Sequence, residues 1–194
     1  MMKKKILKAL AVAVCAILLV VGSVAGTLAY LTSKTNPITN TFTAGNVSIT
    51  MDEAKVTPYG VKDGDTRVQT NEYKLIPGHT YLKDPTVYVD ASSENCWIFV
   101  KIENGLGAAA TLAMDNANWT RIAGTDVWYY NDVAEAGEKY TPFTGFTLDT
   151  AADVNALATQ SIVVTAYAIQ ADNLNSATDA WTAAPAEWKS TNNG

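Results

Sequence analysis

The chain has 194 residues, enough for a single domain with a hydrophobic core of its own. It carries 19 acidic and 14 basic residues, and the net charge of −5 argues against nucleic acid or an anionic membrane as partner. One histidine in the whole chain leaves few ligands for a zinc centre.

The N-terminus has the three parts of a secretory signal. Four lysines lie within the first eight positions, an apolar run extends from Ala9 to Val21, and small residues follow it. The run of 13 residues is shorter than the roughly 20 that a membrane-spanning helix needs. We expect cleavage after Ala29, so that residues 1–29 are removed and the mature chain begins at Tyr30. Cleavage after Ala25 and an uncleaved anchor are the alternatives.

Processing changes both the charge and the cysteine content of the chain. The mature chain keeps 10 basic and 19 acidic residues and only one cysteine, Cys96. An internal disulfide is then impossible, and we expect a secreted protein stabilised by its core. Because Cys96 begins an apolar run, we expect a buried strand cysteine, with an intermolecular bridge as the alternative. We expect no membrane partner after cleavage.

The mature chain has the patterns of strands joined by turns. Apolar and polar residues alternate, and Gly, Pro, Asn and Asp separate the runs. A turn is predicted at residues 63–65, and a hairpin joins two aromatic-rich strands. Strands are predicted at residues 47–51, 73–76, 86–89, 97–102, 119–122, 127–130, 143–148 and 161–170.

Two stretches favour helix instead. Residues 150–159 are consistent with a helical turn, and residues 172–183 predict a short helix that packs on the sheets. We expect one domain over residues 41–188, followed by a flexible tail at 189–194. The sequence thus predicts an all-β protein, a β-sandwich with one or two short helices.

A search for chemistry yields no catalytic or metal site. His79 lies next to a Pro-Gly turn, outside any H-E-x-x-H pattern, and no G-x-S-x-G is present. Pairing of Cys96 with His79 as a nucleophile is disfavoured by the apolar strand around the cysteine. Asp63 and Asp65 match only a fragment of a calcium loop. We therefore expect no enzyme, no cofactor and no metal.

The aromatic side chains allow one further function. Trp97, Trp119 and the run 128–130 could line a sugar-binding face, as in a surface adhesin, or could be core residues and cross-strand pairs.

Six segments of the chain together resemble the TasA/camelysin family of exported proteins of Gram-positive bacteria. This resemblance implies a jelly-roll sandwich, processing by a signal peptidase of the SipW type, and a role in extracellular fibres of the biofilm matrix. It also implies a metalloprotease activity, for which this chain lacks a recognisable ligand set, so we carry over no catalytic residues. The segments are residues 26–32 (GTLAYLT), 40–49 (NTFTAGNVSI), 75–78 (LIPG), 83–89 (KDPTVYV), 97–102 (WIFVKI) and 166–171 (AYAIQA).

The segment exposed by cleavage suggests how such fibres assemble. Residues 30–40 precede the first clear strand and carry partly apolar positions at Tyr30, Leu31 and Ile38, while Pro37 marks a kink or an end. We expect this segment to add as a strand to a neighbouring copy, or to a related matrix fibre protein, head to tail. The alternatives are a disordered leader, a camelysin-like extracellular metalloprotease and a surface adhesin.

Overall fold

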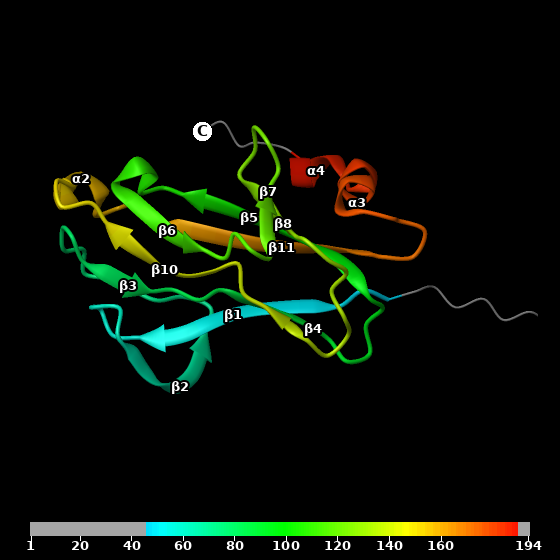
Figure 1. Cartoon of the computed structure of the whole chain (residues 1–194). Coiled ribbons are helices and arrows are strands. Elements are labelled where there is room, and N and C mark those ends of the chain that lie inside the picture. Colours follow the sequence, from blue (N-terminus) through cyan, green and yellow to red (C-terminus); the bar gives the residue numbers. More distant parts are fainter. Residues whose placement is uncertain (1–45, 190–194) are drawn as a thin grey trace, which may run out of the picture. The chain divides into compact units, whose positions relative to one another are not determined.

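Strands dominate the computed structural model, which describes residues 46–189 (Figure 1). The predicted signal at 1–29, the predicted donor segment at 30–40 and residues 190–194 of the predicted tail lie outside this range. The strands are β1 (Ile49–Val56), β2 (Lys62–Val68), β3 (Thr80–Leu82), β4 (Thr86–Val89), β5 (Cys96–Asn104), β6 (Ala110–Met114), β7 (Trp119–Arg121), β8 (Val127–Tyr130), β9 (Lys139–Tyr140), β10 (Phe143–Leu148) and β11 (Ile162–Gln170).

The strands form three antiparallel sheets with the orders β2-β1-β4-β9, β3-β10-β6 and β11-β5-β8-β7. The largest buried cluster takes side chains from β1 and β4 of the first sheet and from β5, β7 and β11 of the third. Its position between the layers confirms the predicted all-β sandwich. The jelly-roll connectivity stays a prediction.

Strands β5 and β11 form the longest ladder of the fold. Nine consecutive pairs run from Ile162 opposite Asn104 to Gln170 opposite Cys96 without a register shift. The predicted alternation is confirmed, because Ile162 and Val164 pack on the main core, while Tyr167 belongs to a separate cluster on the other face of the sheet.

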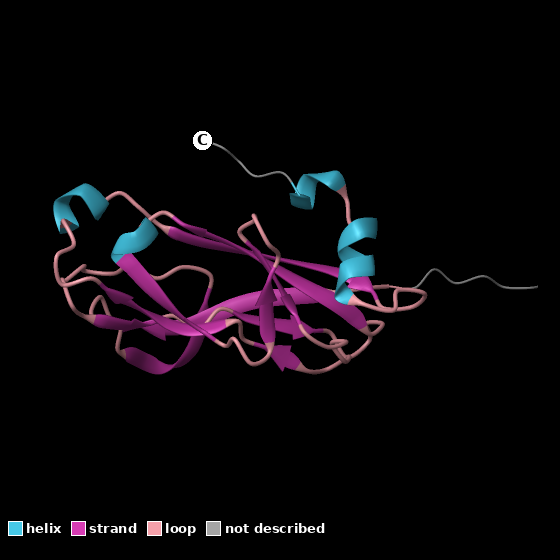
Figure 2. Ribbon diagram, turned by 45° about the horizontal axis from the view of Figure 1, so that its top comes forward, coloured by secondary structure: helices cyan, strands magenta, loops and turns pink. Residues whose placement is uncertain are grey.

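Short helices lie at one end of the sandwich and over the outer face of its third sheet (Figures 1 and 2). Helix α2 (Val154–Leu157) and the 3₁₀ turn η1 (Gly107–Ala109) lie at the end, and α3 (Ala177–Ala183) and α4 (Ala186–Lys189) lie over the sheet face. Ser176 caps α3, whose buried alanines pack with Trp97 and Phe99 on the outer face of β5. The predicted helical turn and the predicted helix on the sheets are both confirmed.

The turn predicted at residues 63–65 is wrong, because these residues lie inside β2. The chain reverses earlier, where the Thr57 amide donates to the Val61 carbonyl and Gly60 adopts a φ of 71°. Gly64 has a φ of 74° within the strand, opposite a register shift in β1. Gly64 therefore allows a bulge within the ladder and does not mark the turn between the two strands.

The strand predicted at residues 73–76 is also wrong, since this segment forms no ladder. Its backbone bonds go elsewhere: the Lys74 amide donates to the Pro58 carbonyl, and the Ile76 amide donates to the Tyr81 hydroxyl. Tyr73 and Leu75 pack on the second core cluster. Tyr73 and Leu75 share a face, as in a strand, but the segment joins none of the sheets within residues 46–189.

Candidate functional site

The described residues form a groove of about 730 Å³. Its walls come from residues 51–53 of β1, the connection 68–75 that follows β2, and residues 154–164, which comprise α2 and the start of β11. Lys83, Pro85, Leu106 and Phe146 complete the lining. The groove therefore joins segments more than 100 residues apart in the sequence.

One wall of the groove is an unpaired strand edge. β11 pairs with β5 on one side, and within residues 46–189 no strand pairs with its other side. Its nine residues include no charged side chain, and Val163 at the groove is 46% exposed. Natural edge strands are usually short, charged or bulged, because unpaired N–H and C=O groups attract other strands. The edge of β11 has none of these protections.

The first half of β1 offers a second incomplete edge. Ile49–Asp52 pairs with β4, whereas the pairing with β2 begins only at Glu53. On the open side, the Gln69 side chain donates to the Met51 carbonyl at 2.8 Å, in place of a strand. Met51 and Asp52 line the groove, so the groove has an open strand edge on each side.

The end of the groove next to α2 is apolar. Leu75, Leu106, Leu157 and Ile162 line it and belong to the second core cluster, beneath which Phe146 is 2% exposed. An apolar strand side chain placed here would be removed from water, which stabilises a complex by about 1.5–3 kcal/mol for a fully buried Leu or Ile.

The side of the groove formed by β1 carries paired charges. Lys83 donates to Glu53 at 2.6 Å, and Asn71 donates to the other Glu53 oxygen at 2.9 Å. Both charged side chains are nearly buried, and each has a partner. This cluster fixes the connection 68–75 against β1.

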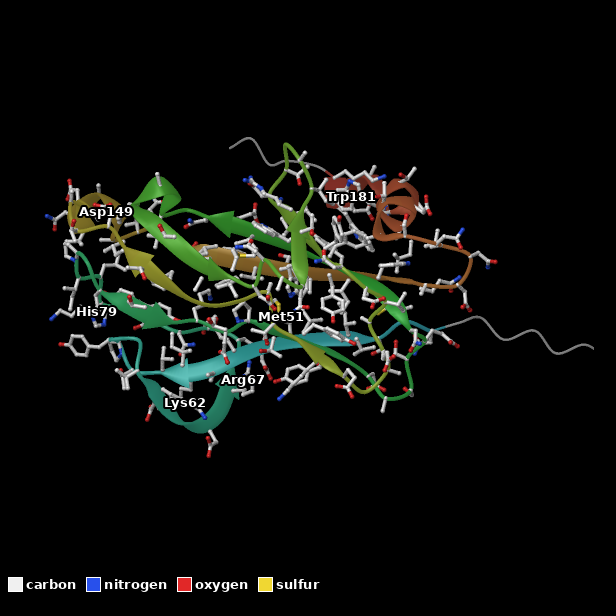
Figure 3. The ribbon with its side chains drawn as sticks, viewed as in Figure 1. Met51, Lys62, Arg67, His79, Asp149 and Trp181 are labelled. Atoms are coloured by element: carbon white, nitrogen blue, oxygen red, sulfur yellow. The ribbon has the colours of Figure 1, made fainter. Side chains whose placement is uncertain are left out.

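Arg67 provides a second clamp at the same wall (Figure 3). Its guanidinium donates to the carboxylates of Asp52 and Asp84, to the carbonyls of both residues and to the Thr86 hydroxyl. Burial alone would lower the pKa of Arg67, but the hydrogen bonds to Asp52 and Asp84 raise it above its ordinary value. The clamp therefore stays charged and ties β2 to β1 and β4.

Tyr73 lies on the same wall and has a perturbed pKa. Burial raises the pKa of its hydroxyl, and the charges of Glu53 and Asp84 raise it further. The hydroxyl donates to the Leu82 carbonyl at 3.0 Å. This hydrogen bond ties the connection 68–75 to β3.

The residues predicted for cleavage and assembly, Ala29, Tyr30, Leu31 and Ile38, lie outside residues 46–189. His79 and Cys96 are both described, and the structure does not bring them together. His79 bonds the Tyr59 carbonyl at 2.9 Å and stacks edge-on against Tyr81 at one end of the sandwich, whereas Cys96 lies in the main core.

Cys96 is fully buried, which confirms the predicted strand cysteine and contradicts the intermolecular bridge. Burial raises the pKa of its thiol to about 11. A thiol of this kind is a poor nucleophile at neutral pH.

Among residues 46–189, no group of three or more His, Cys, Asp or Glu side chains is arranged to hold a metal ion. Asp63 and Asp65 are engaged by Lys55 and Lys62 in surface ion pairs. No helix of the described part is long and apolar enough to cross a membrane.

The aromatic residues considered for sugar binding do not form one exposed face. Trp97 and Trp119 are 6% and 2% exposed. Trp128 packs on the main core and Tyr129 on the cluster across the sheet, while Tyr130 lies edge-on to Trp119. These side chains serve the packing of the third sheet.

Sequence reasoning missed the groove and its charged wall. One signal was visible, because Glu53 continues the core-facing series of Ile49 and Met51 along β1. A carboxylate at such a position indicates a buried charge with a partner. A second signal was the absence of charge along the nine residues of β11.

Comparison with family models, curated proteins and solved structures finds no match to this chain. The resemblance of its segments to the TasA/camelysin family therefore stays a prediction.

Proposed function

We propose that this is a secreted, non-enzymatic structural protein that builds extracellular fibres by strand donation, as the resemblance to the TasA/camelysin family implies. Residues 30–40 of one copy would add to the open edge of β11 in the next. The observation that carries the proposal is the long, uncharged edge of β11 beside a groove with an apolar end. A jelly-roll connectivity and a place in the biofilm matrix or on the cell surface belong to the same proposal.

The chemistry of the groove favours a peptide strand as its occupant. A strand placed along β11 would satisfy the unpaired backbone groups of both partners through main-chain hydrogen bonds. The apolar end would supply a pocket for a side chain of the incoming strand. Extended, 11 residues span about 36 Å, enough to run along the nine residues of β11, which span about 30 Å.

The positions of the chain ends favour a second copy over the same copy. The Glu94 amide donates to the Asn46 carbonyl, and the Ala171 amide donates to the Asn95 carbonyl. Asn46 therefore lies at the end of the sandwich where β11 finishes (Figure 1). The groove borders the start of β11, beside Ser161–Val164, near the opposite end. Such a contact does not close on itself, so repetition builds a filament.

This arrangement sets the direction of the incoming strand. A neighbour stacked on the α2 end would present its Asn46 there, and the chain preceding Asn46 would run inward along the groove. Its N-terminus would then point towards Gln170, so the donated strand would be antiparallel to β11.

The deciding experiment compares a protein that begins at Tyr30 with one that begins at Thr41. We expect filaments by electron microscopy only from the longer protein, and capping of growth by a free peptide of residues 30–40. Equal filament formation by both proteins would refute strand donation, as would no filament formation under any condition.

Two further measurements test export and the absence of catalysis. The intact mass of the secreted protein should correspond to a chain that begins at Tyr30, after cleavage by a signal peptidase of the SipW type. Retention of residues 1–29 would contradict export by this route. The purified protein should not digest casein; chelator-sensitive digestion that His79→Ala abolishes would support a metalloprotease instead.

A further inference from the structure

The groove has one carboxylate that its surroundings leave unpaired. Four charged residues line it: Asp52, Glu53, Glu72 and Lys83. Arg67 holds Asp52, and Lys83 holds Glu53. The carboxylate of Glu72 is exposed and forms no hydrogen bond or ion pair with any residue in the described range 46–189. The groove therefore presents a negative charge to whatever enters it.

The segment proposed as the donor carries the opposite charge. Within residues 30–40 the only charged side chain is Lys34. In an extended strand alternate residues share a face, so Lys34 would share one with Tyr30 and Ile38. The fixed φ of Pro37 allows this where its missing N–H faces away from β11. Lys34 and Ile38 are four residues apart, or about 13 Å along a strand.

The groove offers matching positions in the same order. Its apolar end is formed by Leu75, Leu157 and Ile162. The connection 68–75 runs from Gln69, whose side chain donates to the Met51 carbonyl, to Leu75 at the apolar end. Glu72 lies between them, three residues before Leu75. A strand that enters at the α2 end therefore passes the apolar lining first and the carboxylates next.

We propose that Lys34 of the incoming segment pairs with Glu72 of the receiving copy, while Ile38 of the same segment occupies the apolar end beside Leu157 and Ile162. This inference rests on the proposed function. It defines the register of the donated strand and the kind of strand that the groove accepts. The antiparallel direction derived above places Ile38 at the mouth and Lys34 further in.

The pair would act mainly on register and on choice of partner. A slip of one residue would turn Lys34 and Ile38 to the other face, and a slip of two would move the ammonium away from Glu72. An uncharged or acidic strand would cover the Glu72 carboxylate without compensating it, which opposes its binding.

The test is a charge exchange in the secreted full-length mature chain. Lys34→Glu and Glu72→Lys should each raise the concentration needed for filament growth about tenfold, and the double variant should return to near the wild-type value. Sedimentation of filaments measures this concentration. Circular dichroism and thermal melting of the unassembled protein identify any variant that is misfolded, and an equimolar mixture of the two single variants should assemble better than either alone.

The matched control exchanges an exposed ion pair elsewhere. Arg121 and Asp126 lie 3.1 Å apart in the β7–β8 hairpin, and both are about half exposed. Arg121→Glu and Asp126→Lys change the net charge as the two groove variants do, and neither should alter filament growth.

The outcomes separate this inference from the proposed function. If removal of residues 30–40 leaves filament growth unchanged, strand donation itself is wrong. If that removal abolishes growth but Lys34→Glu assembles like the wild type, the donated strand is right and the Lys34–Glu72 pair is wrong. If both single variants fail and the double variant stays inactive although folded, the pairing is likewise wrong.

Discussion

The Nζ atom of Lys83 lies 2.6 Å from Oε2 of Glu53, and the two side chains are 11% and 7% exposed. Breaking a buried pair by removing one partner leaves an uncompensated charge and typically costs about 3–5 kcal/mol. We expect Glu53→Ala to lower the free energy of unfolding in urea by about 3 kcal/mol.

The surface pair Lys55–Asp63 is the control for this prediction, because its side chains are 50% and 48% exposed. Asp63→Ala should cost less than about 1 kcal/mol. Equal losses for the two variants would mean that Lys83 reaches water when Glu53 is absent.

Gly60 and Gly124 form a matched pair for the turns. Their φ angles are 71° and 74°, but a Cβ on Gly60 would lie 2.7 Å from the Cα of Tyr81, whereas Gly124 has no atom within 4 Å of that position. Gly124→Ala should cost about 1–2 kcal/mol for backbone strain alone. Gly60→Ala should cost about 1–3 kcal/mol more, because the turn must move off β3. Chemical denaturation measures both, and similar values would show that the turn moves freely.

A charge on the open edge of β11 should block assembly without unfolding the protein. Val163→Lys places an ammonium on that edge, as natural edge strands often do. Thr111→Lys does the same on β6, the outer strand of the second sheet. We expect only Val163→Lys to suppress filaments in electron microscopy, with melting temperatures within a few degrees of the wild type for both. Suppression by Thr111→Lys alone would place the acceptor edge on β6.

The Cys96 thiol should make the fold sensitive to alkali. Its pKa is raised from 9.0 to about 11 by burial, so the unfolded chain releases the proton first as the pH rises. The stabilising contribution is complete below pH 9 and is lost as the pH rises towards 11, by up to about 2–3 kcal/mol. Urea unfolding between pH 8 and 11 should therefore show a steeper loss for the wild type than for Cys96→Ala. Parallel curves, or rapid labelling of the native thiol, would contradict this.

The elements that sequence could predict are those in which local pattern and packing agree. β5 and β11 have continuous apolar or alternating runs, and both were found close to their true bounds. The helical spacing of Leu174, Ala177 and Trp181 predicted α3.

The failures arise where the outcome depends on a distant partner. Residues 73–76 alternate like a strand, but the amide of Lys74 finds a turn carbonyl at Pro58 instead of a ladder. β9 has only two residues and exists because Val87 and Tyr88 lie beside it. The groove combines residues 51–53, 68–75 and 154–164, and no local pattern joins these segments.

The register of β5 against β11 has a consequence for the order of folding. The paired residues lie 58 to 74 positions apart along the chain, so nearly the whole domain must have emerged before this ladder can form. Until then the apolar strand β5 lacks its longest neighbour. The open edge of β11 is then among the last features to appear. Under the proposed export and strand donation, a chain still passing through the export machinery would have no site to offer another copy.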